Sequence, residues 1–146
     1  MLYAEDLAVG QRFQFGSYVI SEEEILRFAG QYDPIFIHTD KEAAAKGPFG
    51  GLIASGFNTL AIYQRLVVEA VWSNVAGIVG RSFEVRLFRP VRPDTRISGH
   101  CEVQSITLRP ERRDGVAIFK SELTDESGQT ILTLVLDSLV HARPRP

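Results

Sequence analysis

The sequence lacks the features that mark several large classes of protein. Its single cysteine, Cys101, excludes an intramolecular disulfide, and no spacing of cysteine and histidine resembles that of a zinc site. No apolar run approaches the ~20 residues of a membrane-spanning helix, and the chain does not open with a basic segment followed by an apolar one, as a signal peptide would. We therefore expect a soluble, cytoplasmic, metal-free protein in which Cys101 is a core thiol.

An excess of positive charge is also absent. The chain has 16 lysines and arginines against 18 aspartates and glutamates, and its formal net charge is -2. Because nucleic-acid binding relies on clustered lysine and arginine, we expect no nucleic-acid partner. At 146 residues, 45% of them hydrophobic, the chain fits one domain, residues 1–146, with its own core.

Hydrophobic periodicity predicts helices first and strands later. Ser21 and Glu24 form a capping box that opens a short helix, which ends before Pro34, and a second small helix is expected at 41–46. The segment 52–71 is apolar around most of its helical surface, which is typical of a buried helix.

Alternation of apolar and polar residues predicts the strands. In the first of them Phe13, Phe15 and Val19 should face inward, with Tyr18 facing out. The last strand is apolar on both faces and should lie inside the sheet. Strands segregated from helices predict an α+β fold, with an antiparallel sheet around the long helix. The strands are expected at 11–20, 83–87, 97–106, 116–123 and 130–140, with turns at Asp114-Gly115 and Ser127-Gly128.

Asp33 and His38 stand five positions apart in a loop between the two small helices. The residues between them are apolar, so both side chains should lie near a cleft. Histidine titrates near neutrality and a desolvated carboxylate can approach it, so the two form a candidate acid/base pair. The plainer interpretation is structural, because Asp-Pro is a common turn former and a lone histidine often only packs or caps.

A run of small residues, 50–56, leads into the long helix. Free amides at a helix N-terminus carry partial positive charge and can receive a polarised carbonyl oxygen, and Gly56 would let a ligand approach the backbone. The alternative is that small residues merely allow close helix–sheet packing. Together, an acid/base pair and an amide oxyanion site are the parts needed to hydrate a double bond conjugated to a thioester.

With these segments in view, the sequence resembles the MaoC-like dehydratase family, which includes the (R)-specific enoyl-CoA hydratases. The resemblance covers most of the chain and rests on three segments: Phe28-Ala29-Gly30-Gln31-Tyr32-Asp33-Pro34 through His38-Thr39-Asp40, Pro48-Phe49-Gly50-Gly51-Leu52-Ile53-Ala54-Ser55-Gly56, and Phe83-Glu84-Val85-Arg86-Leu87-Phe88-Arg89-Pro90-Val91.

The resemblance implies a hot-dog fold, usually paired as a homodimer or a dimer of dimers. It implies that Asp33 and His38 activate a water, and that the amide of Gly56, beside Ser55, holds the thioester carbonyl oxygen. The substrate would be an acyl-CoA of fatty acid metabolism, with CoA entering as part of that substrate and no other cofactor.

The chain departs from the hydratase motif Asp-x-Asn-Pro-x-His at one informative position. Ile35 stands where the motif has asparagine, and it can offer no hydrogen bond. We expect Ile35 and Phe36 to form an apolar wall of the substrate site, favouring bulkier or branched acyl groups.

Two other functions remain open. A hot-dog thioesterase would need a carboxylate on the long helix, where Glu69 is the sole acid and lies far from the N-terminal end. A catalytically idle acyl-CoA-binding or partner domain would keep the fold without the reaction.

Overall fold

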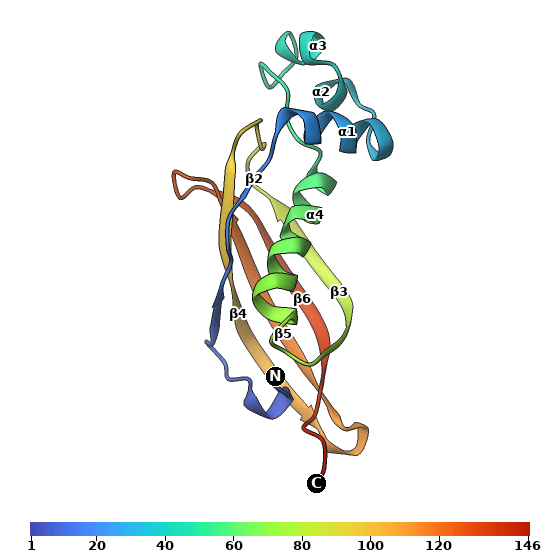
Figure 1. Cartoon of the computed structure of the whole chain (residues 1–146), viewed down its shortest axis with the longest axis vertical. Coiled ribbons are helices and arrows are strands. Elements are labelled where there is room, and N and C mark those ends of the chain that lie inside the picture. Colours follow the sequence, from blue (N-terminus) through green and yellow to red (C-terminus); the bar gives the residue numbers. More distant parts are fainter.

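The computed structural model describes residues 1–146 and has the α+β architecture expected. Three short helices form one end of the molecule, and a long helix lies against a six-stranded antiparallel sheet (Figure 1). The elements in chain order are η1 (Ala4–Asp6), β1 (Arg12–Gln14), β2 (Tyr18–Val19), α1 (Glu22–Tyr32), α2 (Phe36–Thr39), α3 (Lys41–Ala45), α4 (Gly56–Val67), the π-helical turn η2 (Val68–Trp72), β3 (Gly77–Leu87), β4 (Arg96–Arg109), η3 (Pro110–Arg112), β5 (Asp114–Thr124) and β6 (Thr130–His141).

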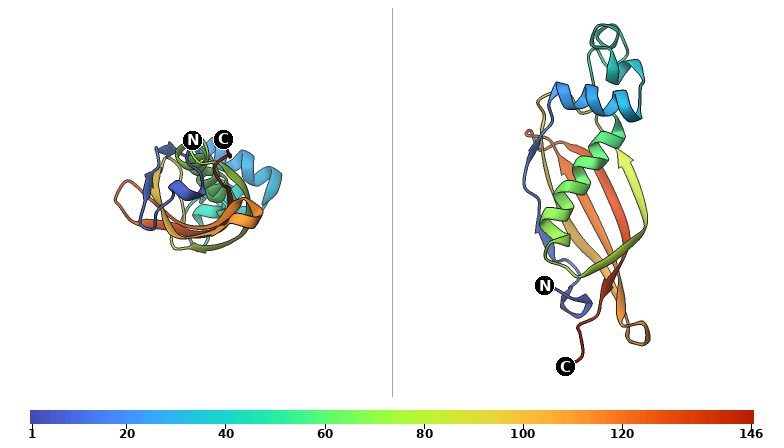
Figure 2. Two further views of the ribbon diagram at one scale, coloured as in Figure 1. Left: turned by 90° about the horizontal axis from the view of Figure 1, so that it is seen from below. Right: turned by 45° about the vertical axis from the view of Figure 1, so that its right-hand side comes forward.

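The sheet has the strand order β1-β4-β5-β6-β3, with β2 also paired to β4. It curves around α4, which runs along its concave face (Figure 2). The last strand, β6, has β5 on one side and β3 on the other, as its apolar character predicted. β3 lies at the edge, and nearly all of its residues are exposed.

The core lies between α4 and the sheet. Buried α4 residues contact buried strand residues because both elements direct an apolar face inward. The Cys101 thiol lies within this core, where burial raises its pKa to about 11, so it is the inert core thiol expected. The main members are Ile62, Tyr63, Leu66, Val67, Cys101, Val103, Phe119, Leu123 and Leu132. No helix in the chain combines the length and apolarity needed to cross a membrane.

The predicted first strand, 11–20, is wrong in its second half. It splits into β1 and β2, because the chain leaves the ladder at 15–17, and the inward-facing positions shift by one residue there. Phe15 and Ile20 are buried, whereas Val19 is exposed and Tyr18 is partly buried. The alternation of apolar and polar residues in the sequence does not reveal this shift of the inward-facing positions.

Two other predicted boundaries also differ. The turn between β4 and β5 is made by η3 and Arg113, at φ 57°, so Asp114 and Gly115 already belong to β5. α4 begins at Gly56 rather than 52, because the backbone amides of Ile53 and Ala54 donate outside any helix, to Ile37 O and Val91 O. The second turn, at Ser127-Gly128, is present, with Gly128 at φ 79°.

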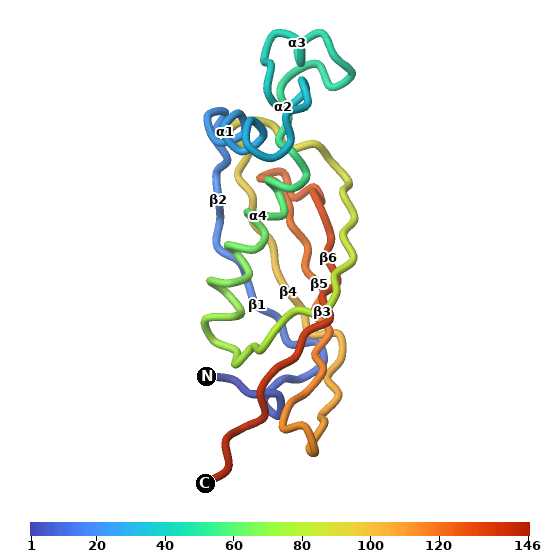
Figure 3. The backbone as a smooth tube through the Cα atoms, turned by 90° about the vertical axis from the view of Figure 1, so that its right-hand side faces the viewer, coloured from blue at the N-terminus to red at the C-terminus, as the bar shows by residue number.

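The three short helices lie together above the N-terminal end of α4 (Figure 3). α1 starts where predicted, with the Ser21 hydroxyl accepting from the Glu24 amide at 3.1 Å. The capping box is incomplete, because the Glu24 carboxylate turns instead to Asn58 and Tyr18. His38, expected in a loop, lies in the single-turn helix α2. This end of the molecule therefore brings α1, α2 and the start of α4 together.

Candidate active site

Asp33 is the residue at which α1 ends. Its backbone amide donates to Ala29 O at 2.9 Å, and Pro34 prevents a further turn of helix. The carboxylate is partly buried and accepts a 2.7 Å hydrogen bond from the Ser55 hydroxyl. The chain thus holds a carboxylate at the boundary between its helical end and the start of α4.

His38 lies opposite this carboxylate and is buried. Its Nδ1 is 2.7 Å from the carbonyl oxygen of Ile53. Since a carbonyl only accepts, Nδ1 carries the proton, and Nε2 of the neutral ring is left as an acceptor. That Nε2 lies 3.6 Å from Asp33 Oδ2, too far for a direct hydrogen bond.

Ser55 connects this pair to α4. It is fully buried, and as the N-cap residue of α4 its Oγ accepts from the Phe57 amide at 3.2 Å while donating to Asp33. Ser55 was predicted to touch substrate; in the structure its hydroxyl is committed to Asp33 and to the helix cap. A serine directly before the first residue of a helix is a favoured N-cap, and this position indicates the capping role.

Gly56 is the first residue of α4, and its N–H has no hydrogen-bond partner within the chain. First-turn amides have no intrahelical acceptor, and the positive end of the helix dipole lies there. A Cβ at Gly56 would stand 2.8 Å from Leu87 Cδ1, the end of a flexible and largely exposed side chain, so a larger residue here would require Leu87 to turn away. The approach of a ligand to the Gly56 backbone stays a prediction.

Ile35 and Phe36 lie between Asp33 and His38 in the sequence, but their side chains are about half exposed to solvent. Ile35 is 51% exposed and Phe36 47% exposed. The Ile35 backbone amide donates a 2.7 Å hydrogen bond to the Asp33 carbonyl oxygen, and this makes a tight turn between the two candidate catalytic residues. Their role as a wall of the substrate site stays a prediction.

Taken together, the structure joins Asp33, His38 and Ser55 by direct contacts, with the Gly56 amide one residue away. The orienting carbonyl of Ile53 was not foreseen, because no side-chain pattern marks it. His38 Nε2 and Asp33 Oδ2 are both acceptors, so one water placed between them could donate an O–H to each.

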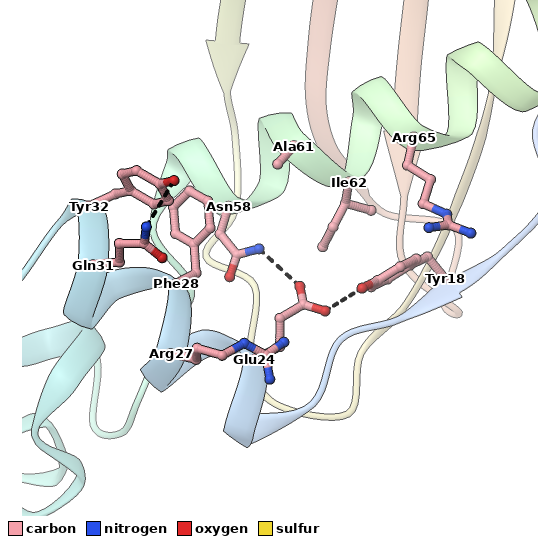
Figure 4. Close-up of a pocket in the computed structure, with 10 residues that line it drawn as sticks. All are labelled: Tyr18, Glu24, Arg27, Phe28, Gln31, Tyr32, Asn58, Ala61, Ile62 and Arg65. Atoms are coloured by element: carbon pink, nitrogen blue, oxygen red, sulfur yellow. Dashed lines mark hydrogen bonds between the residues drawn. The ribbon is translucent and has the colours of Figure 1, made fainter.

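A cavity lies between α1 and α4, and none of the candidate site residues described above lines it (Figure 4). Its polar centre is Glu24, whose carboxylate accepts from Asn58 Nδ2 at 3.0 Å and from the Tyr18 hydroxyl. The hydrogen bond to Glu24, together with burial, raises the pKa of Tyr18. No sequence pattern marks this cluster, because its members lie on three separate elements.

Comparison with known proteins gives a consistent picture. The family model described as "MaoC like domain" matches residues 6–123. An uncharacterized Bacillus subtilis protein, YdeM, is 37% identical over 111 residues, covering 75% of this chain and 77% of YdeM. A 3-hydroxyacyl-thioester dehydratase Z from Mycobacterium tuberculosis is 46% identical over 61 residues, which is 40% of each chain.

Solved structures agree with these matches. A MaoC-like dehydratase from Rhodospirillum rubrum superposes with a TM-score of 0.93 and 34% identity, over 99% of this chain and 100% of that one. The (R)-hydratase PhaJ1 from Pseudomonas aeruginosa, at 19% identity and a TM-score of 0.75, covers 97% of this chain and 86% of its own and shares the fold. The predicted hot-dog fold is confirmed.

Proposed function

The chain belongs to the MaoC-like domain family, and from this premise we propose that it is an acyl-thioester hydro-lyase of the enoyl-CoA hydratase or 3-hydroxyacyl-CoA dehydratase type. The observation that carries the proposal is the approach of His38 Nε2 to within 3.6 Å of Asp33 Oδ2, each group held by a second contact. Relatives named as a 3-hydroxyacyl-thioester dehydratase and as an (R)-hydratase support the same reaction class.

In the hydration direction, a water donates one O–H to His38 Nε2 and the other to Asp33 Oδ2. Its oxygen attacks C3 of the enoyl thioester as a proton passes to the pair, which then delivers a proton to C2. The elements of water are thereby added across the double bond, and no redox step is needed. General acid/base transfer of this kind contributes typically ~10²–10⁴-fold.

Negative charge develops on the thioester oxygen when water attacks C3. The free N–H of Gly56, at the positive end of α4, would donate to that oxygen. Ser55 orients Asp33 through its 2.7 Å hydrogen bond, and Ile53 O fixes the tautomer of His38. In this mechanism Asp33 and His38 are the catalytic residues, and Ser55 is a positioning residue.

Crotonyl-CoA separates this proposal from its two alternatives. Hydration removes the enoyl absorbance without freeing thiol, hydrolysis by a thioesterase frees thiol, and an idle binding domain does neither. A thioesterase on this fold would need the carboxylate of Glu69. Glu69 lies in η2, at the opposite end of the helix from Gly56. It is more than half exposed and accepts from Arg65 Nε at 3.0 Å. We therefore expect loss of the enoyl signal alone; release of thiol would overturn the proposal.

The edge strand β3 supports a homodimer, or a multiple of one. An exposed edge offers unpaired backbone groups to another chain, and two-fold pairing is the commonest solution. Apolar side chains on β3 are largely open, with Phe83 65% and Val79 54% exposed. Sedimentation should give a dimer at micromolar concentration, weakened by Phe83→Asp; a stable wild-type monomer would contradict this assembly.

A further inference from the structure

The end of the molecule opposite α1–α3 carries an open cavity lined by basic side chains. Its volume is about 590 Å³, and its wall includes Arg112, Arg113 and His141. None of the residues that line it is acidic. Figure 1 shows both chain ends at this end of the molecule, with the three short helices at the other. A chain with a formal net charge of -2 thus gathers positive charge in one cavity.

The two arginines of this cavity have no acidic partner. Two nearby carboxylates form ion pairs with other arginines, Asp114 with Arg109 and Asp6 with Arg143. No carboxylate pairs with Arg112 or Arg113, and both side chains are exposed. The N–H donors of both guanidinium groups are therefore available to a ligand.

Arg113 is held in a backbone conformation that few residues with a side chain adopt. Its φ is 57°, in the left-handed region, at the turn between η3 and β5. Glycine or asparagine would fill this turn with less strain. The turn is also tied to the end of β6, since the Ala142 amide donates to Arg113 O at 3.0 Å. The chain keeps an arginine at an unfavourable position and fixes its backbone, which favours a role for the side chain.

A small molecule with phosphate groups suits this cavity. Guanidinium groups bind phosphate through paired N–H···O hydrogen bonds, and a neutral imidazole adds an N–H donor. The free positive charge does not continue along the surface, because Arg109 and Arg143 are paired, whereas a nucleic acid needs many basic groups along its track. CoA, the carrier in the proposed reaction, has a diphosphate and a 3′-phosphate on one compact nucleotide.

The cavity is too far from the candidate site of its own protomer for one CoA molecule to reach both. Gly56 lies beside Leu87, at one end of β3. Ala76 and Ile78, which line the cavity, lie at the other end. The 11 residues of β3 span roughly 33 Å, at ~3.3 Å each. The pantetheine arm between the thioester and the phosphates is shorter than this span.

The homodimer proposed above brings the two together. A two-fold axis perpendicular to the sheet pairs two edge strands antiparallel. An axis near Ser82, the middle of β3, pairs the strand along its whole length. The Leu87 end of one protomer then lies beside the Gly77 end of its partner. The Gly56 amide of each protomer therefore adjoins the basic cavity of the other.

We propose that Arg112, Arg113 and His141 of one protomer bind the phosphates of a CoA thioester whose acyl end is held by the partner. The inference rests on the hydro-lyase function and the homodimer proposed above. The arginines donate to the phosphate oxygens, and the pantetheine arm runs along the subunit boundary to the partner's Gly56. Each complete site is thus made by two chains.

The first test measures CoA binding by titration calorimetry. Arg112→Gln and Arg113→Gln should each weaken binding of CoA about tenfold, as expected for loss of a charge-assisted hydrogen bond. Lys120→Gln, which removes the same charge at an exposed position on β5 outside the cavity, is the matched control and should bind CoA as the wild type does. Unchanged affinity in both arginine variants would overturn the proposal. So would inorganic phosphate binding as tightly as CoA, which would indicate a site for free phosphate.

The second test asks which protomer supplies the arginines. A heterodimer is purified through two affinity tags from an Asp33→Asn protomer and a protomer carrying both Arg112→Gln and Arg113→Gln. If the site is shared, one of its two sites has every wild-type group, so the KM for crotonyl-CoA should be that of the wild type. If each chain supplied its own arginines, neither site would be intact. A raised KM like that of the arginine variant would therefore overturn the proposal.

The proposed function and this inference fail in different ways. Arginine-dependent binding of CoA without any hydration of crotonyl-CoA would defeat the proposed function alone. Hydration by the wild type with CoA binding unchanged in the arginine variants would defeat this inference alone.

Discussion

The Ser55 hydroxyl donates a 2.7 Å hydrogen bond to Asp33 Oδ2, across 22 positions of sequence. Ser55 is also the N-cap of α4, so one side chain both starts the central helix and orients the carboxylate at the end of α1. The positive end of α4 therefore lies beside a carboxylate, so the helix dipole and the carboxylate attract each other. Ser55 therefore contributes both to the proposed catalytic geometry and to the stability of α4.

Ser55 variants should separate these two roles. Both Ser55→Ala and Ser55→Gly remove the bond to Asp33, so both should lower kcat by roughly 10- to 100-fold. The loss of the cap should destabilise Ser55→Ala by about 1 kcal/mol and Ser55→Gly by only a few tenths, because glycine is a tolerated N-cap. Kinetics with urea unfolding would measure both. A kcat that followed stability instead, with Ser55→Gly near wild type, would show that the bond to Asp33 does not matter.

Gly56→Ala should act through Leu87. The new methyl would meet Leu87 Cδ1 at 2.8 Å, and because this atom ends a flexible side chain that is 56% exposed, the Leu87 side chain can turn away. We therefore expect a small loss of stability, about 1 kcal/mol and at the lower end for overpacking, together with a modest reduction of turnover. Adding Leu87→Ala should restore much of the turnover, because the backbone N–H is still present. If the double variant were no more active than Gly56→Ala, the steric explanation would be wrong.

Ile35→Asn should raise activity on a short, straight substrate. The asparagine of the hydratase motif offers both a donor and an acceptor, whereas isoleucine offers neither. One hydrogen bond that strengthens in the transition state corresponds to roughly one decade in rate, so kcat/KM for crotonyl-CoA should rise about tenfold. In the wild type, a branched enoyl-CoA should be turned over better than crotonyl-CoA. A kcat/KM for crotonyl-CoA above that of every larger or branched substrate would contradict the role given to Ile35.

Stability at low pH should depend on Asp114. Arg109 donates two hydrogen bonds to it, at 2.7 and 2.8 Å, and these hold the pKa of the Asp114 carboxyl below its ordinary 3.8. A lowered folded-state pKa means that the stabilisation is complete above about pH 4 and is lost as pH falls through the folded-state pKa. The destabilisation caused by Asp114→Asn should therefore be constant near neutrality and shrink below pH ~4. Urea unfolding across pH would measure this, and a destabilisation unchanged between neutral and strongly acidic pH would contradict the role given to the ion pair.

The fold was predictable because most of its information is local. The capping serine at Ser21, the apolar surface of α4 and the apolar last strand each specify their own element. The failure at 11–20 is also local in origin: the shift at 15–17 depends on pairing with β4, which no period-two pattern encodes.

The site was predictable in part. Asp33, His38 and the start of α4 follow from residue type and position, and the structure brings them together. Features that depend on contacts between residues distant in the sequence could not be predicted. These are the Ile53 carbonyl that orients His38 and the cluster of Tyr18, Glu24 and Asn58. Glu24 shows why: its sequence context predicts a capping role, and tertiary contacts redirect its carboxylate.

The most direct test of the account is kcat for crotonyl-CoA hydration in Asp33→Asn and His38→Ala, with Asp40→Asn as the matched control. Asp40 lies two residues after His38 and only caps α3, a role that asparagine fills equally well. Each catalytic variant should keep the wild-type circular dichroism and lose ~10²-fold or more in kcat, as expected of general acid/base groups, while Asp40→Asn keeps wild-type turnover. Near-normal turnover by a folded Asp33→Asn or His38→Ala enzyme would contradict the assignment of this pair as the catalytic centre.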